Sequence, residues 1–302
     1  MHAFLESDAE DKPALQPKAA IGPAVRAAAA NILMTARAAI TDPERTTQQA
    51  VHDFRRAMKQ WRALMRLLKP FIPDAVRWRR EARDHARSLG PARDSQSALN
   101  AFDDLSKNGI ALSERSIATI RRRIEAMRGS EERSVLTPEL RDSIAAWLES
   151  ALAAVEVWPL DSLDFNSIAA QLAACYREVR RQLPPDWSRA SAGDLHVFRQ
   201  RVVDHRYQMD LVEPLWPRYG RMWTGEAERL RDRLGRCQDI EILRSLTEPH
   251  QPLAPWRSRL TPACAERSTE LAQRAARIAL RLFAEKPKAF RRRLEALWEH
   301  GR

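Results

Sequence analysis

Apolar residues recur at spacings of three and four along most of the chain, which is the pattern of helices with one buried face. The clearest example is the segment 51–70, whose apolar positions are Val51, Phe54, Met58, Trp61, Met65 and Leu68. A second stripe in this segment, displaced by one residue, is basic and consists of His52, Arg55, Lys59, Arg62 and Arg66. At about 100° per residue, the basic stripe lies about a quarter-turn from the apolar one, beside the buried face.

The basic stripe has two explanations. It extends about 21 Å along a helix that rises about 1.5 Å per residue, and a row of cations is costly to align unless an anion neutralises it. Alternatively, it is an ordinary solvated face whose long aliphatic stems cover apolar surface. One helix alone does not decide between them.

The same segment occurs a second time. Residues 195–214 match residues 51–70 at an offset of 144, and the matching positions hold Leu195, His196, Phe198, Arg199, Arg206, Met209, Leu211 and Pro214. A second pair of segments, Leu-Gly-x-x-x-Asp at 89–94 and at 234–239, matches at an offset of 145. An internal repeat of this length predicts two structurally similar halves.

The remaining segments predict an all-α protein. No segment has a convincing strand pattern, and the chain has only nine glycines and three tyrosines. A linker at 159–164 divides the first half, about 23–158, from the second, about 164–300, and the acidic residues 1–22 are expected to form a disordered tail. The expected helices are 23–40, the basic segment up to 70, 74–90, 93–107, 113–128, 137–156, 165–183, 194–214, 225–245, 257–285 and a last helix from 287.

The chain is strongly basic, with a net charge of +11 and a pI of about 10.2. This charge predicts an anionic partner but leaves nucleic acid, polyphosphate and anionic lipid open. No apolar run reaches about 18 residues, so no membrane span is expected, and the N-terminus lacks the pattern of a signal peptide. The three cysteines, Cys175, Cys237 and Cys264, are far apart and suggest buried thiols in a reducing compartment. We therefore expect a cytoplasmic protein.

The sequence offers few residues for catalysis. The histidines lack a metal-ligand spacing such as H-x-x-x-H, adjacent acidic residues diverge on a helix, and there is no glycine-rich phosphate loop. We therefore expect no cofactor, no metal site and no enzymatic activity.

Three motifs together resemble the CHAD domain, the conserved histidine α-helical domain, over about residues 23–300. The motifs are His52-x-x-Arg55-x-x-x-Lys59-x-x-Arg62, His196-x-x-Arg199 with Arg206 and Tyr207, and the two Leu-Gly-x-x-x-Asp segments. The resemblance implies two four-helix-bundle-like halves related by a pseudo-two-fold axis, with a central basic groove that binds inorganic polyphosphate. The second copy departs from the first, because Val203 stands at the position of Lys59 and Asp210 at that of Arg66.

Polyphosphate is a flexible polyanion without bases, so its recognition requires many charge-assisted hydrogen bonds from rigidly spaced donors. Arginine suits this task because its planar fork engages two phosphate oxygens. The two histidines have an alternative structural role as partly buried, hydrogen-bonded residues. The residues that we expect to bind polyphosphate are His52, Arg55, Lys59, Arg62, Arg66, Arg80, Arg83, Arg87, His196, Arg199 and Arg206.

Asp94 and Asp239 are expected to close the two Leu-Gly-x-x-x-Asp turns and to orient a neighbouring arginine rather than to catalyse a reaction. The alternating Glu-x-Glu-x-Lys strand of the tripolyphosphatase-type enzymes that are often fused to this domain is absent from the sequence. We therefore expect a stand-alone, non-catalytic module that associates with polyphosphate granules. A nucleic-acid-binding helical protein is the main alternative, and an enzyme of polyphosphate metabolism is a weaker one. Tryptophans such as Trp61 and Trp147 occupy apolar helix positions and are expected in the core.

Overall fold

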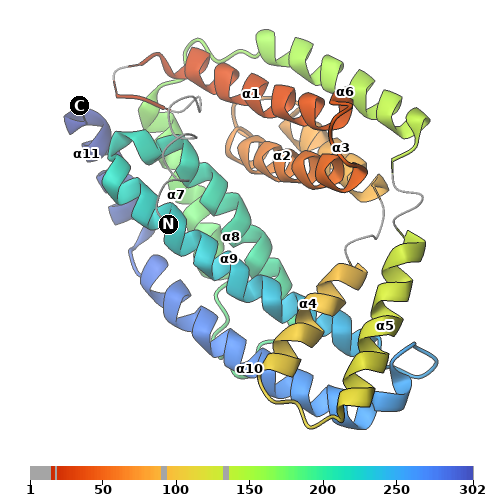
Figure 1. Cartoon of the computed structure of the whole chain (residues 1–302). Coiled ribbons are helices and arrows are strands. Elements are labelled where there is room, and N and C mark those ends of the chain that lie inside the picture. Colours follow the sequence, from red (N-terminus) through yellow and green to blue (C-terminus); the bar gives the residue numbers. More distant parts are fainter. Residues whose placement is uncertain (1–14, 18, 90–93, 132–135, 302) are drawn as a thin grey trace.

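The computed structural model describes residues 15–17, 19–89, 94–131 and 136–301, and their regular elements are all helical (Figure 1). This confirms the all-α prediction. The elements are α1 (Ile21–Thr41), α2 (Thr47–Leu67), α3 (Ala75–Ser88), α4 (Asp94–Lys107), α5 (Glu114–Glu131), α6 (Pro138–Glu156), α7 (Phe165–Arg181), α8 (Ala192–Val212), η2 (Glu213–Leu215), α9 (Pro217–Ser245), η3 (Ala254–Trp256), α10 (Arg257–Leu282) and α11 (Pro287–His300).

The two repeated helices begin in the same way. The Thr46 side chain caps α2 and the Ser191 side chain caps α8, and each helix has a reciprocal bond from its third residue, Gln49 or Asp194. The sequence therefore places the start of α8 two residues too late, at 194, because Ser191 rather than Asp194 is the cap. Prolines in the first turn begin α6, α9 and α11, where the missing N–H donor costs nothing.

The second Leu-Gly-x-x-x-Asp segment is not a turn, so the prediction that Asp239 closes one is wrong. Residues 234–239 lie inside α9, a continuous helix of 29 residues. In the first copy, Asp94 begins α4, and residues 90–93 lie outside the described residues. The difference has a local cause. Pro91 cannot donate a helical hydrogen bond, whereas Arg236, its counterpart at the offset of 145, can.

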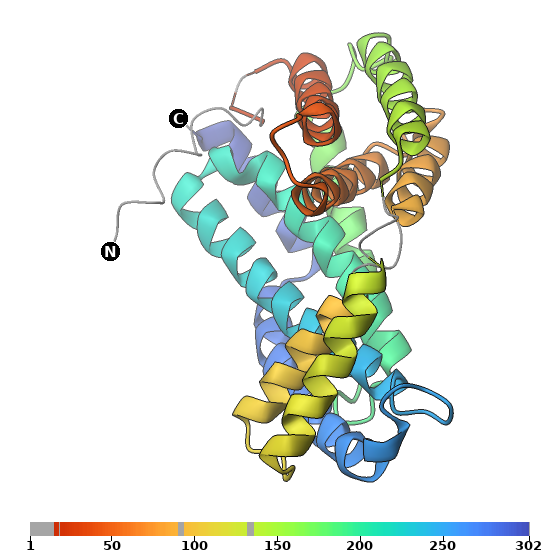
Figure 2. The same ribbon diagram turned by 45° about the vertical axis from the view of Figure 1, so that its right-hand side comes forward.

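The helices pack in three groups (Figures 1 and 2). The first group contains α1, α2, α3 and α6, and the second contains α7, α8, α11 and the start of α9. The third is formed where the α4–α5 hairpin packs on α9 and α10, with Asp104 of α4 bonded to Arg267 of α10. A hairpin from the first half of the sequence thus packs on helices of the second half. The pseudo-two-fold relation of the halves stays a prediction.

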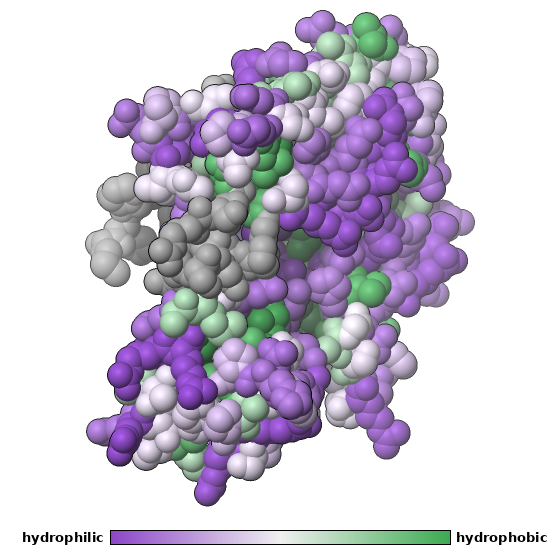
Figure 3. All heavy atoms as spheres, turned by 90° about the vertical axis from the view of Figure 1, so that its right-hand side faces the viewer, coloured by the Kyte–Doolittle hydropathy of each residue, from purple (hydrophilic) through white to green (hydrophobic). Residues whose placement is uncertain are grey.

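The repeated helices α2 and α8 lie against each other at the centre of the molecule. Ala63 of α2 packs on Val203 and Tyr207 of α8, and the buried Gln208 side chain donates a hydrogen bond of 3.1 Å to the Ala63 carbonyl oxygen. This contact fixes the distance between the basic side chains of the two copies. On one face of the molecule, a hollow separates the first group from the α4–α5 hairpin, and hydrophilic side chains gather over the first group (Figure 3).

The last residues of the expected tail are part of the folded protein. Leu15 is completely buried, and its N–H donates to the Leu211 carbonyl oxygen of α8 at 2.8 Å. Ile21 and Gly22 already belong to α1, and a side chain at Gly22 would collide with the Leu160 carbonyl oxygen. The start of α1 therefore packs directly against the linker between the halves. Residues 1–14 lie outside the described residues.

The core agrees with the apolar pattern. Trp61 is completely buried, whereas Trp147 is only partly buried. The three cysteines are free and buried, and burial raises the pKa of the Cys175 thiol to about 11 and that of Cys237 to about 12. No helix among the described residues combines the length and apolar character needed to cross a membrane.

His205 is a polar residue in the core that links α8 to α9. Its Nε2 accepts a hydrogen bond of 2.9 Å from the Trp223 indole N–H, and its side chain lies among aromatic rings. Burial lowers the pKa of the His205 imidazole to about 3, so the ring is neutral at neutral pH.

The buried imidazole predicts a loss of stability in acid. The unfolded chain takes up a proton on His205 near pH 6.5, whereas the folded chain does so only near pH 3. The free energy of unfolding therefore has its full value above pH 6.5 and decreases below it, by about 2 kcal/mol at pH 5. Urea unfolding of the wild type and of His205→Gln at pH 7.5 and pH 5 measures this difference. His52→Gln, at an exposed position, is the control. An equal pH effect in wild type and His205→Gln would contradict the assignment.

Candidate anion-binding site

Arginines from three helices converge on one buried carboxylate where α2, α3 and α8 meet. The Asp204 Oδ2 atom of α8 lies 3.8 Å from Arg66 Nε of α2, 3.9 Å from Arg79 Nη2 of α3 and 3.7 Å from Arg201 Nη1 of α8 itself. Arg62, one turn before Arg66 on α2, also acts on Asp204 through its charge. We call these four arginines and Asp204 the Asp204 cluster.

The cluster carries an excess of positive charge in a partly desolvated position. Burial lowers the pKa of the Arg62 and Arg79 guanidinium groups, and the neighbouring charges of Arg83 and Arg87 lower that of Arg62 further. Within the described residues, the buried Nε atoms of Arg62 and Arg79 have no hydrogen-bond partner. Cations that are crowded and incompletely paired provide a strong attraction for an anionic ligand.

The other carboxylates near the cluster neutralise only part of its charge. Glu178 of α7 pairs with Arg66, and Asp84 pairs with Arg83 at 2.9 Å. The space between α2, α3 and α7 forms a cavity of about 220 Å³, which Arg66, Arg79 and Cys175 help to line. An anion therefore has both room and positive charge at this edge of the cluster.

The structure brings together part of the predicted first-copy set. Arg62, Arg66, Arg83 and Arg87 are at or next to the Asp204 cluster. Arg55 instead donates from Nε to the Ala86 carbonyl oxygen at 3.2 Å, which ties α2 to the end of α3. His52 and Arg80 are exposed and Lys59 is half-buried.

Arg206, in the second copy of the basic stripe, is neutralised within the protein. Arg206 lies 3.2 Å from Glu228 of α9 and 3.7 Å from Asp210 of α8, and Arg231 shares Glu228 at 3.0 Å. The Arg206 guanidinium also lies over the Tyr207 ring. These pairs leave the second copy with much less attraction for an anion than the first.

The sequence contains a signal for this asymmetry, which the comparison of the two basic stripes alone does not reveal. The offset of 145 that relates the Leu-Gly pairs also relates Trp78 of α3 to Trp223 of α9. At that offset, the three α3 arginines at positions 79, 83 and 87 correspond to Thr224, Glu228 and Asp232. Only the first copy therefore has arginines at these three positions beside its basic stripe.

The remaining predicted residues have structural contacts. Arg199 donates to Gln238 at 3.3 Å, and its guanidinium lies against Gly235 of α9. The His196 ring is hydrogen-bonded to Gln200. Asp94 is exposed at the start of α4, whereas Asp239 is half-buried and lines an open cavity between α4 and α9. Whether any of these residues binds a ligand stays a prediction.

Three residues of the cluster, Arg79, Arg201 and Asp204, were not among the sequence-predicted site residues. Arg201 and Asp204 lie off the repeated basic stripe, and their counterparts in the first copy are Ala57 and Gln60. The available signal was the segment 202–207, in which the apolar residues Val202, Val203 and Tyr207 point in several directions around the helix. Such a helix is buried on more than one side, so an acidic residue within it requires cationic partners.

The comparison with known families agrees with the motifs. The model of the CHAD domain matches residues 20–248, from the start of α1 to just beyond α9. The chain belongs to the CHAD family. The match includes every residue of the Asp204 cluster, and it confirms the resemblance that the duplicated motifs suggested. No curated protein matches the chain closely enough to add a relative.

Arg79 and Arg80 provide a matched test of the cluster, because they are adjacent on α3 but only Arg79 faces Asp204. A multivalent anion that binds the folded protein raises its unfolding midpoint. Sulfate should raise the midpoint of the wild type and of Arg80→Gln by several degrees, and that of Arg79→Gln clearly less. Thermal unfolding followed by circular dichroism, with and without sulfate at constant ionic strength, measures this. Equal responses of the two variants would exclude the cluster as the anion site.

Proposed function

We propose that this CHAD protein binds inorganic polyphosphate without cleaving it, and that the first repeat makes the main contacts. The observation that carries the proposal is the convergence of Arg62, Arg66, Arg79 and Arg201 on one carboxylate. Arg83 and Arg87 extend the positive surface along α3, and the α2 stripe extends it toward His52. This surface is longer than a single phosphate needs.

The chemistry of the ligand fits this arrangement. Polyphosphate carries about one negative charge per phosphate, and each phosphate offers several acceptor oxygens. Guanidinium groups on three packed helices keep their spacing before the ligand arrives, which reduces the ordering cost on the protein side. The ligand has no bases, so it needs no stacking platform. We propose association with polyphosphate granules inside the cell as the cellular consequence.

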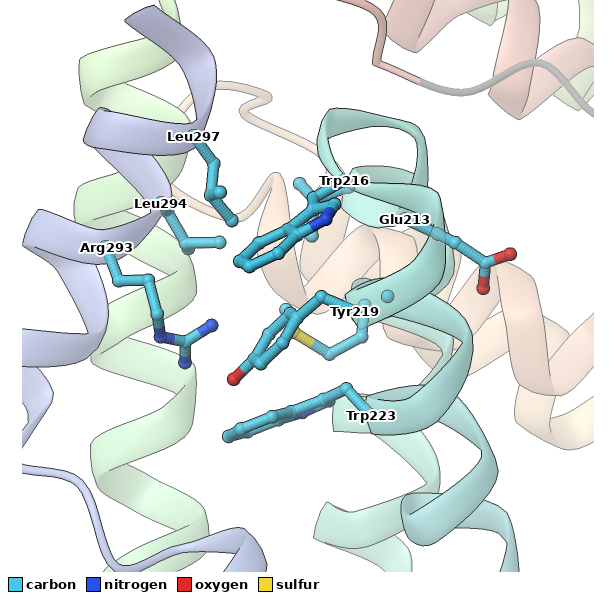
Figure 4. Close-up of a pocket in the computed structure, with 10 residues that line it drawn as sticks. Glu213, Trp216, Tyr219, Trp223, Arg293, Leu294 and Leu297 are labelled. Carbon is cyan, nitrogen blue, oxygen red and sulfur yellow. The ribbon is translucent and has the colours of Figure 1, made fainter. Parts of the chain in front are cut away.

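Nucleic acid is the second candidate, and one feature of the molecule bears on it directly. Trp216, which directly precedes α9, forms a ladder of rings with Tyr219 and Trp223 of α9, and Arg293 of α11 faces this ladder (Figure 4). Single-stranded nucleic acids bind to such combinations when the rings are open to a base. Here, the cavity between them is about 20 Å³, enough for about one water, and Arg293 is paired with Glu285 at 2.6 Å. The ladder therefore favours a packing role.

A polyphosphate-cleaving enzyme is a weaker candidate. Phosphoryl transfer usually requires carboxylates that hold a divalent metal near the phosphates. The carboxylates closest to the cluster, Asp204 and Glu178, face arginines instead. No group of three or more metal-ligating side chains occurs among the described residues. These observations support the proposal of a binding module.

The proposal is tested by comparing ligands of matched total charge. We expect long-chain polyphosphate to bind more tightly than single-stranded or duplex nucleic acid, with an affinity that decreases steeply with salt. Fluorescence anisotropy or calorimetric titration at two salt concentrations measures both properties. Preference for nucleic acid would reject the proposal in favour of the second candidate. Release of phosphate in the presence of magnesium or manganese would reject the proposal that the protein does not cleave polyphosphate.

The repeat supplies an internal control for the proposal that the first copy makes the main contacts with polyphosphate. Arg62 and Arg206 occupy equivalent positions, but Arg206 is paired with Glu228 and Asp210. Because loss of one charge-assisted contact costs roughly 1.5–3 kcal/mol, Arg62→Gln should weaken polyphosphate binding about tenfold or more, and Arg206→Gln about twofold or less. Calorimetric titration of both variants gives the comparison. Equal losses would show that the two copies contribute alike.

A further inference from the structure

Asp204 is an unusual residue for an anion-binding site. It is 7% exposed, and it is the only acidic residue in the described part of the chain that is buried. Its Oδ2 atom accepts no hydrogen bond from the described residues, although three guanidinium groups lie 3.7–3.9 Å away. The carboxylate thus interacts with the arginines by charge more than by directed hydrogen bonds.

The groups that face Asp204 come from every helix around it. They are Arg62 and Arg66 of α2, Arg79 of α3, Arg201 of α8, and Cys175 of α7. Glu178 of α7 is paired with Arg66 beside them. Burial raises the pKa of the Asp204 carboxyl, and the four arginine charges oppose this effect. In the empty protein, Asp204 reduces the mutual repulsion of these arginines.

The Asp204 carboxylate repels a phosphate that approaches the same arginines, because both groups carry negative charge. The two anions compete for one set of cations, one of them fixed in the protein and the other supplied by the ligand. In the second copy, Asp210 and Glu228 already pair with Arg206, so an anionic ligand would have to compete with both carboxylates.

We infer that Asp204 is a built-in counter-charge of the anion site, which stabilises the empty protein and lowers its affinity for phosphate chains. The inference rests on the proposed function for its ligand, but not for its effect on the empty protein. It assigns Asp204 as the residue that sets the affinity of the site. It also gives a reason for a buried carboxylate below a surface that attracts anions.

Asp204→Asn tests the inference, because it removes the charge and nearly preserves the shape. We expect the variant to bind long-chain polyphosphate about tenfold more tightly than the wild type at equal salt, with an equal or steeper salt dependence. We also expect a lower unfolding midpoint without ligand and a larger increase of the midpoint when tripolyphosphate is added. Calorimetric titration and thermal unfolding by circular dichroism measure these effects.

Glu299→Gln is the matched control, because it adds the same net charge at an exposed carboxylate of α11, outside both copies of the basic stripe. We expect a change in affinity of less than about twofold for this control. Equal gains in both variants would mean that only net charge matters. Weaker binding by folded Asp204→Asn, with a shallower salt dependence, would mean that Asp204 positions the arginines. Either result, or an unchanged affinity, overturns the inference.

Three further outcomes keep the tests distinct. If Asp204→Asn does not fold in low salt, the inference expects millimolar tripolyphosphate or sulfate to restore the helical signal, and failure to do so overturns it. If the wild type does not bind polyphosphate, the proposed function fails, while destabilisation of Asp204→Asn and its rescue by sulfate would still support the counter-charge. If the wild type binds and Asp204→Asn is not tighter, the inference fails and the proposed function stands.

Discussion

The contact between α2 and α8 determines where the charges of this protein meet. Ala63 packs on Val203 and Tyr207 along this contact, and Gln208 bonds to the backbone of α2. Asp204 directly follows Val203 on α8, and its carboxylate faces arginines of α2 and α3. The arginine cluster is therefore a product of helix packing between the two halves, and neither half contains it alone.

Concentrating cations at a helix junction is unfavourable unless something compensates for their repulsion. The core helps to hold them together, because α2 and α8 bury large apolar side chains such as Trp61 and Phe198 beside the charged groups. Asp204 compensates for part of the remaining repulsion. A surface that is left partly uncompensated in this way gains from any anion that binds it, and it loses stability when the anion is absent.

The sequence predicted the helices, the repeat, the free buried cysteines and the family, because each of these depends on local periodicity or on residues close in the chain. It failed at 234–239 for a local reason, because Arg236 can donate the bond that Pro91 cannot and the expected turn is a continuous helix. It failed at Asp204 because neighbours in space decide there. Asp204 is separated by more than a hundred residues from the arginines of α2 and α3, so no local pattern indicates their contact.

The duplicated basic helices were expected to act together, and the charges around them argue for a division of roles. Arg206 is paired with Glu228, which α9 supplies at the position where α3 supplies Arg83. The pairs of the second copy contribute to the packing of α8 on α9, while the first copy keeps an excess of positive charge. Under the proposed function, duplication of the scaffold permits one copy to serve stability and the other to serve binding. A symmetric pair of sites would instead have doubled the repulsion at the α2–α8 contact, on which both halves depend.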